Sequence, residues 1–227
     1  MSKNVAVLQP GFVTGPESMG AAAKSIERHG LADEVLLGMS LAHAIRDPAE
    51  FARMIDGKAF IGHSAAEVAL REANRVEPTK RPAEVIAFCP PERVPIVRLT
   101  TSALRLVVRD SAILASGRLN RKVVGHLLRD RTHQLTSEAA MNARLAFDIS
   151  DFSTIELLRA AADAGVRGTI VSVDRDEFFP QPYCCHDFAA KQPTVVEVAG
   201  YHNQFVYEPD TILGQLDCSE AGRLHAA

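Results

Sequence analysis

The chain has 227 residues, of which 47% are hydrophobic and 23% are charged; these values are close to the average for globular proteins and exclude a disordered or fibrous chain. A formal net charge of −3 argues against a general nucleic-acid binder, and no apolar stretch approaches the roughly 18 residues needed to cross a bilayer. We therefore expect a cytoplasmic protein with one substantial core, and neither nucleic acid nor membrane as a partner.

The first part of the chain alternates between predicted strands and predicted helices. Short apolar runs that end at turn residues indicate buried strands at Val5–Leu8, Glu34–Leu37, Lys58–Ile61 and Glu84–Cys89. Runs with a helical period lie between them at Pro16–His29, Asp47–Ile55 and Glu67–Arg75. Because strands that alternate with helices pair in parallel, we predict an α/β fold with a mostly parallel sheet flanked by helices.

The alternation stops at a segment that is largely helical in period. Helices are predicted near Ser102–Ser116, Leu119–Arg131 and Ser137–Phe147. The segment is too long for a plain crossover, so we predict a helical cap, residues 95–150, inserted between two strands of a core formed by residues 1–94 and 151–227. The core pattern then resumes with a helix, two strands and a closing helix at Asp151–Ala164, Gly168–Val173, Thr194–Val198 and Asp210–Leu216.

A serine stands at the sharp strand-to-helix turn predicted for Gly62-His63-Ser64-Ala65-Ala66. A nucleophile elbow needs such a turn, in which small residues two positions before and after the nucleophile let the backbone fold tightly. Gly62 and Ala66 satisfy this requirement, although the strict pattern has glycine at the second place. Taken alone, the stretch also fits an ordinary strand-to-helix turn.

Three reactive residues follow three separate core strands: Ser64, Asp176 and His202. Residues just beyond the carboxyl ends of parallel strands converge in space although they are distant in sequence. A histidine placed there accepts the proton of a serine and returns it to a leaving group, while a carboxylate holds the imidazole in the useful tautomer. The pattern therefore predicts a Ser-His-Asp catalytic triad for acyl transfer to water.

With this elbow and this order of Ser, Asp and His, nearly the whole chain resembles the α/β-hydrolase family. The strand end Val173-Asp174-Arg175-Asp176 is similar to the family's acid loop, and on that pattern Asp176 rather than Asp174 is the triad acid. The stretch from Glu197 to Asn203 is similar to the loop after the family's last strand, which gives His202 the role of base. The resemblance implies a serine hydrolase.

The resemblance also implies an oxyanion hole made by two backbone N–H groups. Ala65, directly after the nucleophile, supplies one of them. Phe12 supplies the other from the loop after the first strand, where Gln9-Pro10-Gly11 replaces the family's common His-Gly pair. Because proline stands in place of that histidine, the shape of the loop is open. The alternative function is therefore a ligand-binding or degenerate hydrolase-fold protein with little turnover.

A triad of this kind needs no metal and no organic cofactor. We expect it to cleave a small carboxylic ester, with a thioester or lactone as alternatives, so that the partner is a small-molecule acyl substrate; a homodimer is left open. His63 is interpreted as structural, and His186 is a weaker candidate for the base. The four cysteines have no metal-ligand spacing and are expected to be reduced: Cys89, Cys184, Cys185 and Cys218.

Overall fold

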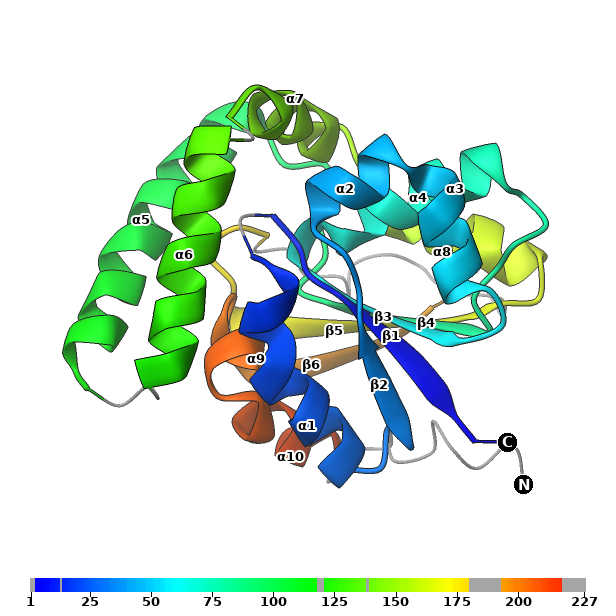
Figure 1. The fold of residues 1–227 in the computed structure, drawn as a ribbon, viewed down its shortest axis with the longest axis horizontal. Helices are drawn as coiled ribbons and strands as arrows, with labels where there is room; N and C mark the ends of the chain where they lie inside the picture. The colour runs from blue at the N-terminus through cyan, green and yellow to red at the C-terminus, as the bar shows by residue number, and fades with distance from the viewer. Residues whose placement is uncertain (1–2, 13, 118–120, 138, 180–192, 218–227) are drawn as a thin grey trace.

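The computed structural model describes residues 3–12, 14–117, 121–137, 139–179 and 193–217. At its centre is a six-stranded sheet in the order β2-β1-β3-β4-β5-β6, in which every neighbouring pair is parallel (Figure 1). The prediction of an α/β fold with a mostly parallel sheet is confirmed. The strands are β1 (Val5–Gln9), β2 (Glu34–Leu37), β3 (Ala59–His63), β4 (Glu84–Phe88), β5 (Arg167–Arg175) and β6 (Thr194–Tyr201).

Helices cover both faces of the sheet. One face is covered by α1 (Gly20–Arg28), α9 (Gln204–Tyr207) and α10 (Pro209–Asp217), with the 3-10 turn η1 (Pro16–Met19) before α1. The other face is covered by α2 (Leu41–Arg46), α3 (Pro48–Ile55), α4 (Glu67–Val76) and α8 (Thr154–Asp163). In Figure 1 the first set lies toward the bottom of the view and the second set lies above the sheet.

The core is divided into two layers because successive side chains of a strand point to opposite faces. In β1, Val7 packs in the layer of α3 and α4, whereas Leu8 packs in the layer of α1 and α10. Phe60 and Ile61 of β3 repeat this division, since they pair in register with Val7 and Leu8. Strands that are covered on both faces are apolar at nearly every position, which is why these runs are recognisable in the sequence.

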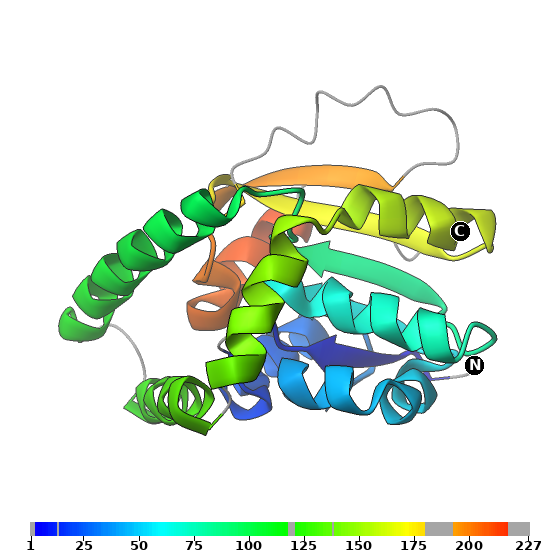
Figure 2. The same ribbon diagram turned by 90° about the horizontal axis from the view of Figure 1, so that it is seen from above.

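Three further helices lie between β4 and β5 in the chain. They are α5 (Ile96–Ala115), α6 (Arg121–Ser137) and α7 (Ala139–Ser150), and they stand together at one end of the sheet, on the left in Figures 1 and 2. The guanidinium of Arg109 in α5 lies 4.2 Å from the centre of the Tyr201 ring and is paired with Glu177. Asp130 in α6 accepts a hydrogen bond from the backbone N–H of Gly15 at 3.1 Å. The cap role of residues 95–150 stays a prediction.

Two short helices were missed by the sequence patterns. Helix α2 has 6 residues and α9 has 4, which is too short for a helical period to be visible. Strand β6 also continues through Gly200 and Tyr201, where the sequence predicts a loop. Within the described residues, none of the helices combines the length and the apolar character that crossing a membrane requires.

Candidate active site

Ser64 lies at the turn between β3 and α4. Strand β3 ends at the residue before it, and a 3-10 turn over Ser64–Ala66 leads directly into the helix. The φ angle of Ser64 is +59°, a left-handed conformation that costs a non-glycine residue about 1–3 kcal/mol. A Cβ on Gly62 would lie 2.3 Å from Oε1 of Glu67 and 2.8 Å from Cε1 of Phe60, so the turn leaves little room for a side chain at this position. The turn therefore has the tight and strained geometry that an elbow requires.

The loop after β1 is packed directly against this turn. A Cβ on Gly11 would lie 2.2 Å from the carbonyl oxygen of His63 and 2.7 Å from Cβ of Ser64. The same point lies 3.1 Å from the backbone nitrogen of Ala65. Only glycine allows this approach, so Gly11 brings the loop that carries Phe12 next to the backbone of the residue after the serine.

The substitution Gly11→Ala should therefore destabilise the protein. We expect the free energy of unfolding to fall by about 1–3 kcal/mol, because the new methyl group overlaps the backbone of the turn. Urea unfolding followed by circular dichroism measures the change. Gly20→Ala is the matched control, since a Cβ on Gly20 would meet no heavy atom within 4 Å and the backbone there is helical. Equal unfolding midpoints for the two variants would contradict the close packing.

Gln9 holds the loop whose shape the sequence left open. Its side chain is fully buried, and its amide N–H groups donate to the carbonyl oxygens of Met39 at 2.8 Å and Pro10 at 3.2 Å. The first bond ties the end of β1 to the segment after the neighbouring strand β2. The glutamine thus has a structural role at the point where the sequence departs from the family pattern.

His202 joins Ser64 to a carboxylate. Its Nε2 atom lies 3.0 Å from Oγ of Ser64, and its Nδ1 atom lies 3.0 Å from both carboxylate oxygens of Asp176. Because a carboxylate only accepts hydrogen bonds, the Nδ1–H group donates to it, and the lone pair on Nε2 is left to accept the serine proton. All three side chains are buried. These contacts bring the three predicted residues together at the carboxyl ends of β3, β5 and β6.

Asp176 is held as a carboxylate by several donors. The backbone N–H groups of Phe178 and Phe179 each donate to its Oδ1 atom at 2.8 Å. Burial raises the pKa of Asp176, but His202 and these two N–H groups outweigh that effect and the net shift is downward. Asp174, by contrast, is half-exposed and accepts a hydrogen bond from the backbone N–H of Gly200 at 2.7 Å.

His63 forms a hydrogen bond with the backbone of His202, the candidate base. It is completely buried, and its Nε2–H group donates to the backbone carbonyl oxygen of His202 at 3.0 Å. Its ring also stacks on Phe205 with the ring centres 5.9 Å apart. Burial and the neighbouring His202 lower the pKa of His63 to about 3, so its imidazole is neutral at physiological pH. The structural interpretation from the sequence fits these contacts, but no sequence signal indicated that His63 anchors the loop of His202.

A buried acid, Glu67, lies at the first position of α4, three residues after the serine. Its side chain has no exposed surface, and within the described residues no other residue forms a hydrogen bond with either carboxyl oxygen. Burial raises the pKa of Glu67 to about 8, so the group is protonated at neutral pH. No sequence pattern indicated this, because a glutamate in the first turn of a helix is ordinarily a solvated favourable charge.

Glu67 should make the stability of the protein fall as the pH rises. Between about 4.5 and about 8 the folded state binds more protons at this group than the unfolded state, so the free energy of unfolding declines across that window. Glu67→Gln removes the group. We expect the melting temperature of this variant to decline less than that of the native protein between about pH 5 and about pH 8.5, by several degrees.

The matched control for this measurement is Glu72→Gln. Glu72 is on the same helix, but it is partly exposed and paired with Arg71. Its variant should keep the native dependence of melting temperature on pH. A Glu67→Gln profile that runs parallel to the native one would contradict the assignment of the raised pKa to this residue.

Cys89 completes the polar group around Asp176. It directly follows β4, is 2% exposed, and has a φ angle of +50°, again a left-handed conformation. Burial and the adjacent Asp176 raise the pKa of its thiol well above the usual value, so the thiol is protonated. Its sulfur and one ligand atom each of Asp176 and His202 all lie within 4.8 Å of one another. The other cysteines and His186 lie outside the described residues.

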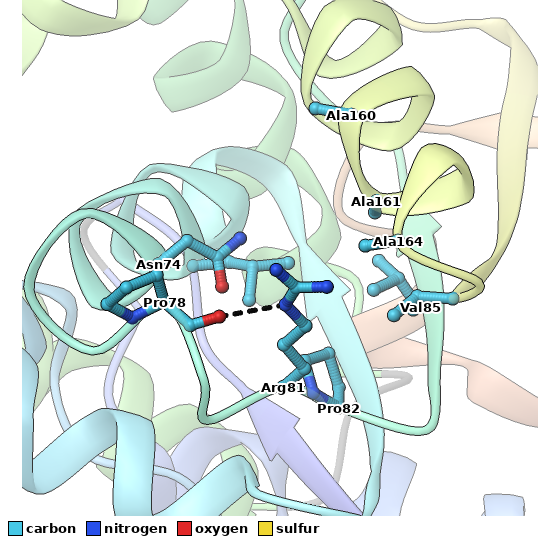
Figure 3. Close-up of a pocket in the computed structure, with 10 residues that line it drawn as sticks. Asn74, Pro78, Arg81, Pro82, Val85, Ala160, Ala161 and Ala164 are labelled. Carbon is cyan, nitrogen blue, oxygen red and sulfur yellow. Dashed lines mark hydrogen bonds between the residues drawn. The ribbon is translucent and has the colours of Figure 1, made fainter.

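A cavity of about 160 Å³ lies elsewhere, between α4 and α8 (Figure 3). Its lining includes Asn74 from α4, Ala161 from α8 and Val85 near the start of β4. The Nε–H group of Arg81 donates to the carbonyl oxygen of Pro78 at its rim, 2.8 Å away (Figure 3). Because the cavity lies near the amino ends of the strands and Ser64 lies at the carboxyl end of β3, it is separate from the candidate active site.

No protein-family model matches this chain, and no curated protein is a recognisable relative in sequence. Solved structures do match. A hydrolase from Oleispira antarctica has 12% identity and a TM-score of 0.58, covering 95% of this chain and 90% of that one. A thermophilic esterase from Thermogutta terrifontis has 15% identity and a TM-score of 0.55, covering 95% and 88%. Rv0554 from Mycobacterium tuberculosis has 14% identity and a TM-score of 0.54, covering 97% and 91%.

These likenesses extend over nearly the whole of this chain, and at such low identity they define its fold. The chain has the α/β-hydrolase fold, as its resemblance to that family implied. The chemistry of the site has to be argued from its own residues, because one fold hosts many activities.

Proposed function

We propose that this protein is a serine hydrolase that cleaves a small carboxylic ester through an acyl-enzyme. The observation that carries the proposal is the continuous hydrogen-bonded path from Ser64 Oγ through His202 to Asp176, with 3.0 Å at each step. The reaction needs a hydroxyl, an imidazole with a free Nε2 lone pair and a carboxylate, and this path supports the proposal because it joins those three types of group in that order.

In the proposed reaction, Ser64 Oγ attacks the ester carbonyl while its proton passes to Nε2 of His202. The resulting imidazolium is stabilised by the carboxylate of Asp176. It then protonates the departing alcohol, and the acyl group is left on the serine. A water molecule gives its proton to Nε2 and attacks the acyl carbonyl, and the serine leaves with that proton.

The negative charge on the tetrahedral intermediate requires two fixed donors. The backbone N–H groups of Ala65 and Phe12 are our candidates. The close contact of Gly11 with the Ser64 turn supports this pairing, because it places the residue before Phe12 against the backbone nitrogen of Ala65. The loop after β1 therefore contacts the Ser64 turn through Gly11, although Pro10 stands where the family pattern has histidine.

We also infer that residues 95–150 cap the site. The support is Arg109 of α5, which is paired with Glu177 and lies over the ring of Tyr201. These two residues are the immediate neighbours of Asp176 and His202 in the chain. A cap held in this position would enclose the acyl group of a substrate and would set the chain length that the site accepts.

A panel of p-nitrophenyl esters with acyl chains of increasing length, supplemented with acyl thioesters and lactones, tests the proposed function. We expect turnover of at least one short-chain ester, with a sharp decline beyond the length that fits under the cap. Absence of turnover on the whole panel, together with saturable binding of an acyl compound, would instead favour the alternative of a ligand-binding protein on this fold.

A further inference from the structure

Cys89, Asp176 and His202 bring a thiol, a carboxylate and an imidazole together in one buried place. Their ligand atoms all lie within 4.8 Å of one another, and Nδ1 of His202 is 3.0 Å from both oxygens of Asp176. The three residues are separated widely in the sequence and come from the ends of β4, β5 and β6, so the grouping exists only in the folded chain. The proposed hydrolysis uses two of them and leaves Cys89 without a role.

We propose that these three side chains form a binding site for a thiophilic divalent cation such as Zn²⁺, and that occupation of the site switches the serine off. Thiolate, carboxylate and imidazole are the three ligand types that zinc takes in proteins, at about 2.0–2.3 Å. Tetrahedral coordination at these lengths places ligand atoms about 3.3–3.8 Å apart. The Nδ1–carboxylate distances of 3.0 Å lie slightly below this range and the outer limit of 4.8 Å lies above it, so binding requires the ligand atoms to move by on the order of 1 Å.

The charge of such a site favours a divalent ion. A thiolate from Cys89 and the carboxylate of Asp176 together carry two negative charges, and the imidazole of His202 is neutral as a ligand. The occupied site is therefore neutral overall, which matters because the three side chains are 2%, 6% and 3% exposed and an unbalanced charge there is costly. The thiolate also selects the ion, since soft sulfur ligands bind Zn²⁺ or Cd²⁺ and not Mg²⁺.

Metal binding changes the tautomer of the base. In the metal-free site, Nδ1 of His202 carries a proton and Nε2 accepts the proton of Ser64. When the lone pair of Nδ1 binds the metal, the single proton of the neutral imidazole moves to Nε2. The Cys89 thiol releases its own proton to solvent, so one proton leaves the protein for each metal bound. An Nε2–H group cannot accept the serine proton, and the nucleophile is no longer activated.

The metal site is tested directly with Co²⁺, whose bond to a thiolate gives an absorption band in the near ultraviolet. Cys184, Cys185 and Cys218 are first replaced by serine in the full chain, so that Cys89 is the only thiol. We expect the band in this background variant and its loss when Cys89→Ser is added. Cys89→Gly is the second variant, because glycine adopts the left-handed backbone at this position without strain. Absence of the band in the background, or its survival in both Cys89 variants, would overturn the site.

The switch is tested by labelling Ser64 with a fluorophosphonate in the presence of Zn²⁺ or Mg²⁺. We expect Zn²⁺ to suppress labelling of the background variant, Mg²⁺ to have no effect, and Cys89→Ser to raise the half-inhibitory Zn²⁺ concentration at least about tenfold. Unchanged labelling at Zn²⁺ concentrations that displace the Co²⁺ band would overturn the tautomer argument. The switch rests on the proposed function, but the Co²⁺ band needs no turnover, so the two can fail independently.

Discussion

Replacing Ser64 with alanine is expected to reduce kcat for a small ester by about 10⁴- to 10⁶-fold. In the proposed reaction the hydroxyl oxygen of Ser64 forms the acyl bond, and it lies 3.0 Å from Nε2 of His202, which would accept its proton. Alanine keeps the backbone of the turn and removes that oxygen alone. The residual rate should be that of an active site that binds and polarises the ester without a nucleophile. Stopped assays at high enzyme concentration measure both rates.

Ser153→Ala is the matched control for this experiment. Ser153 is also a buried serine, 8% exposed, but it caps α8 by accepting a hydrogen bond from the backbone N–H of Glu156 at 3.1 Å. Its loss should cost about 1 kcal/mol of stability and leave kcat unchanged. If Ser64→Ala retained a tenth or more of the native kcat, the serine would not be the nucleophile.

The second large effect is expected for Asp176→Asn, with a loss in kcat on the order of 10⁴-fold. The amide has nearly the same shape, but its NH₂ group cannot accept the proton on Nδ1 of His202. The imidazole is then driven to the tautomer with its proton on Nε2, where it blocks the transfer from Ser64. The effect should appear in kcat, with little change in KM, because the carboxylate does not contact the substrate.

Asp174→Asn distinguishes the two acids of the loop. Asp174 accepts a hydrogen bond from the backbone N–H of Gly200, and the oxygen of an asparagine side chain can accept the same bond. We expect kcat to stay within about threefold of the native value, since the substitution keeps this hydrogen bond. A loss at Asp174 equal to that at Asp176 would contradict the assignment of the triad acid.

The elements that the sequence predicted well are those with strong periodic patterns and clear ends. Strand β2 was predicted with the bounds that the structure has, and α3 and α4 differ from their predictions by one residue. The short helices α2 and α9 were missed because their tertiary contacts, rather than a pattern of their own, determine them. Strands that are buried on both faces were recognisable because their own sequence is a nearly continuous apolar run.

The candidate site was predictable only in part. Ser64, Asp176 and His202 could be named because each follows a recognisable strand, and their order matches a known family pattern. The roles of Gly11, Glu67 and Cys89 could not, since each depends on contacts between segments that are remote in the chain. A glycine beside a proline, a glutamate in a first helical turn and an isolated cysteine are ordinary in sequence. Only the packing of the folded chain makes them unusual. Gly11 lies against the backbone of the Ser64 turn, Glu67 has a raised pKa, and Cys89 lies close to Asp176 and His202.

In the proposed reaction, the side-chain oxygen of Ser64 at one strand end forms a covalent bond with the acyl group, and the imidazole of His202 at another strand end activates it. Mass spectrometry of the intact protein, quenched in acid within seconds of mixing with p-nitrophenyl acetate, tests it most directly. We predict one added acetyl group, located by peptide mapping on Ser64, and none in His202→Ala under the same conditions. An acetyl group on any other residue, or equal acetylation of the two proteins, would contradict the account.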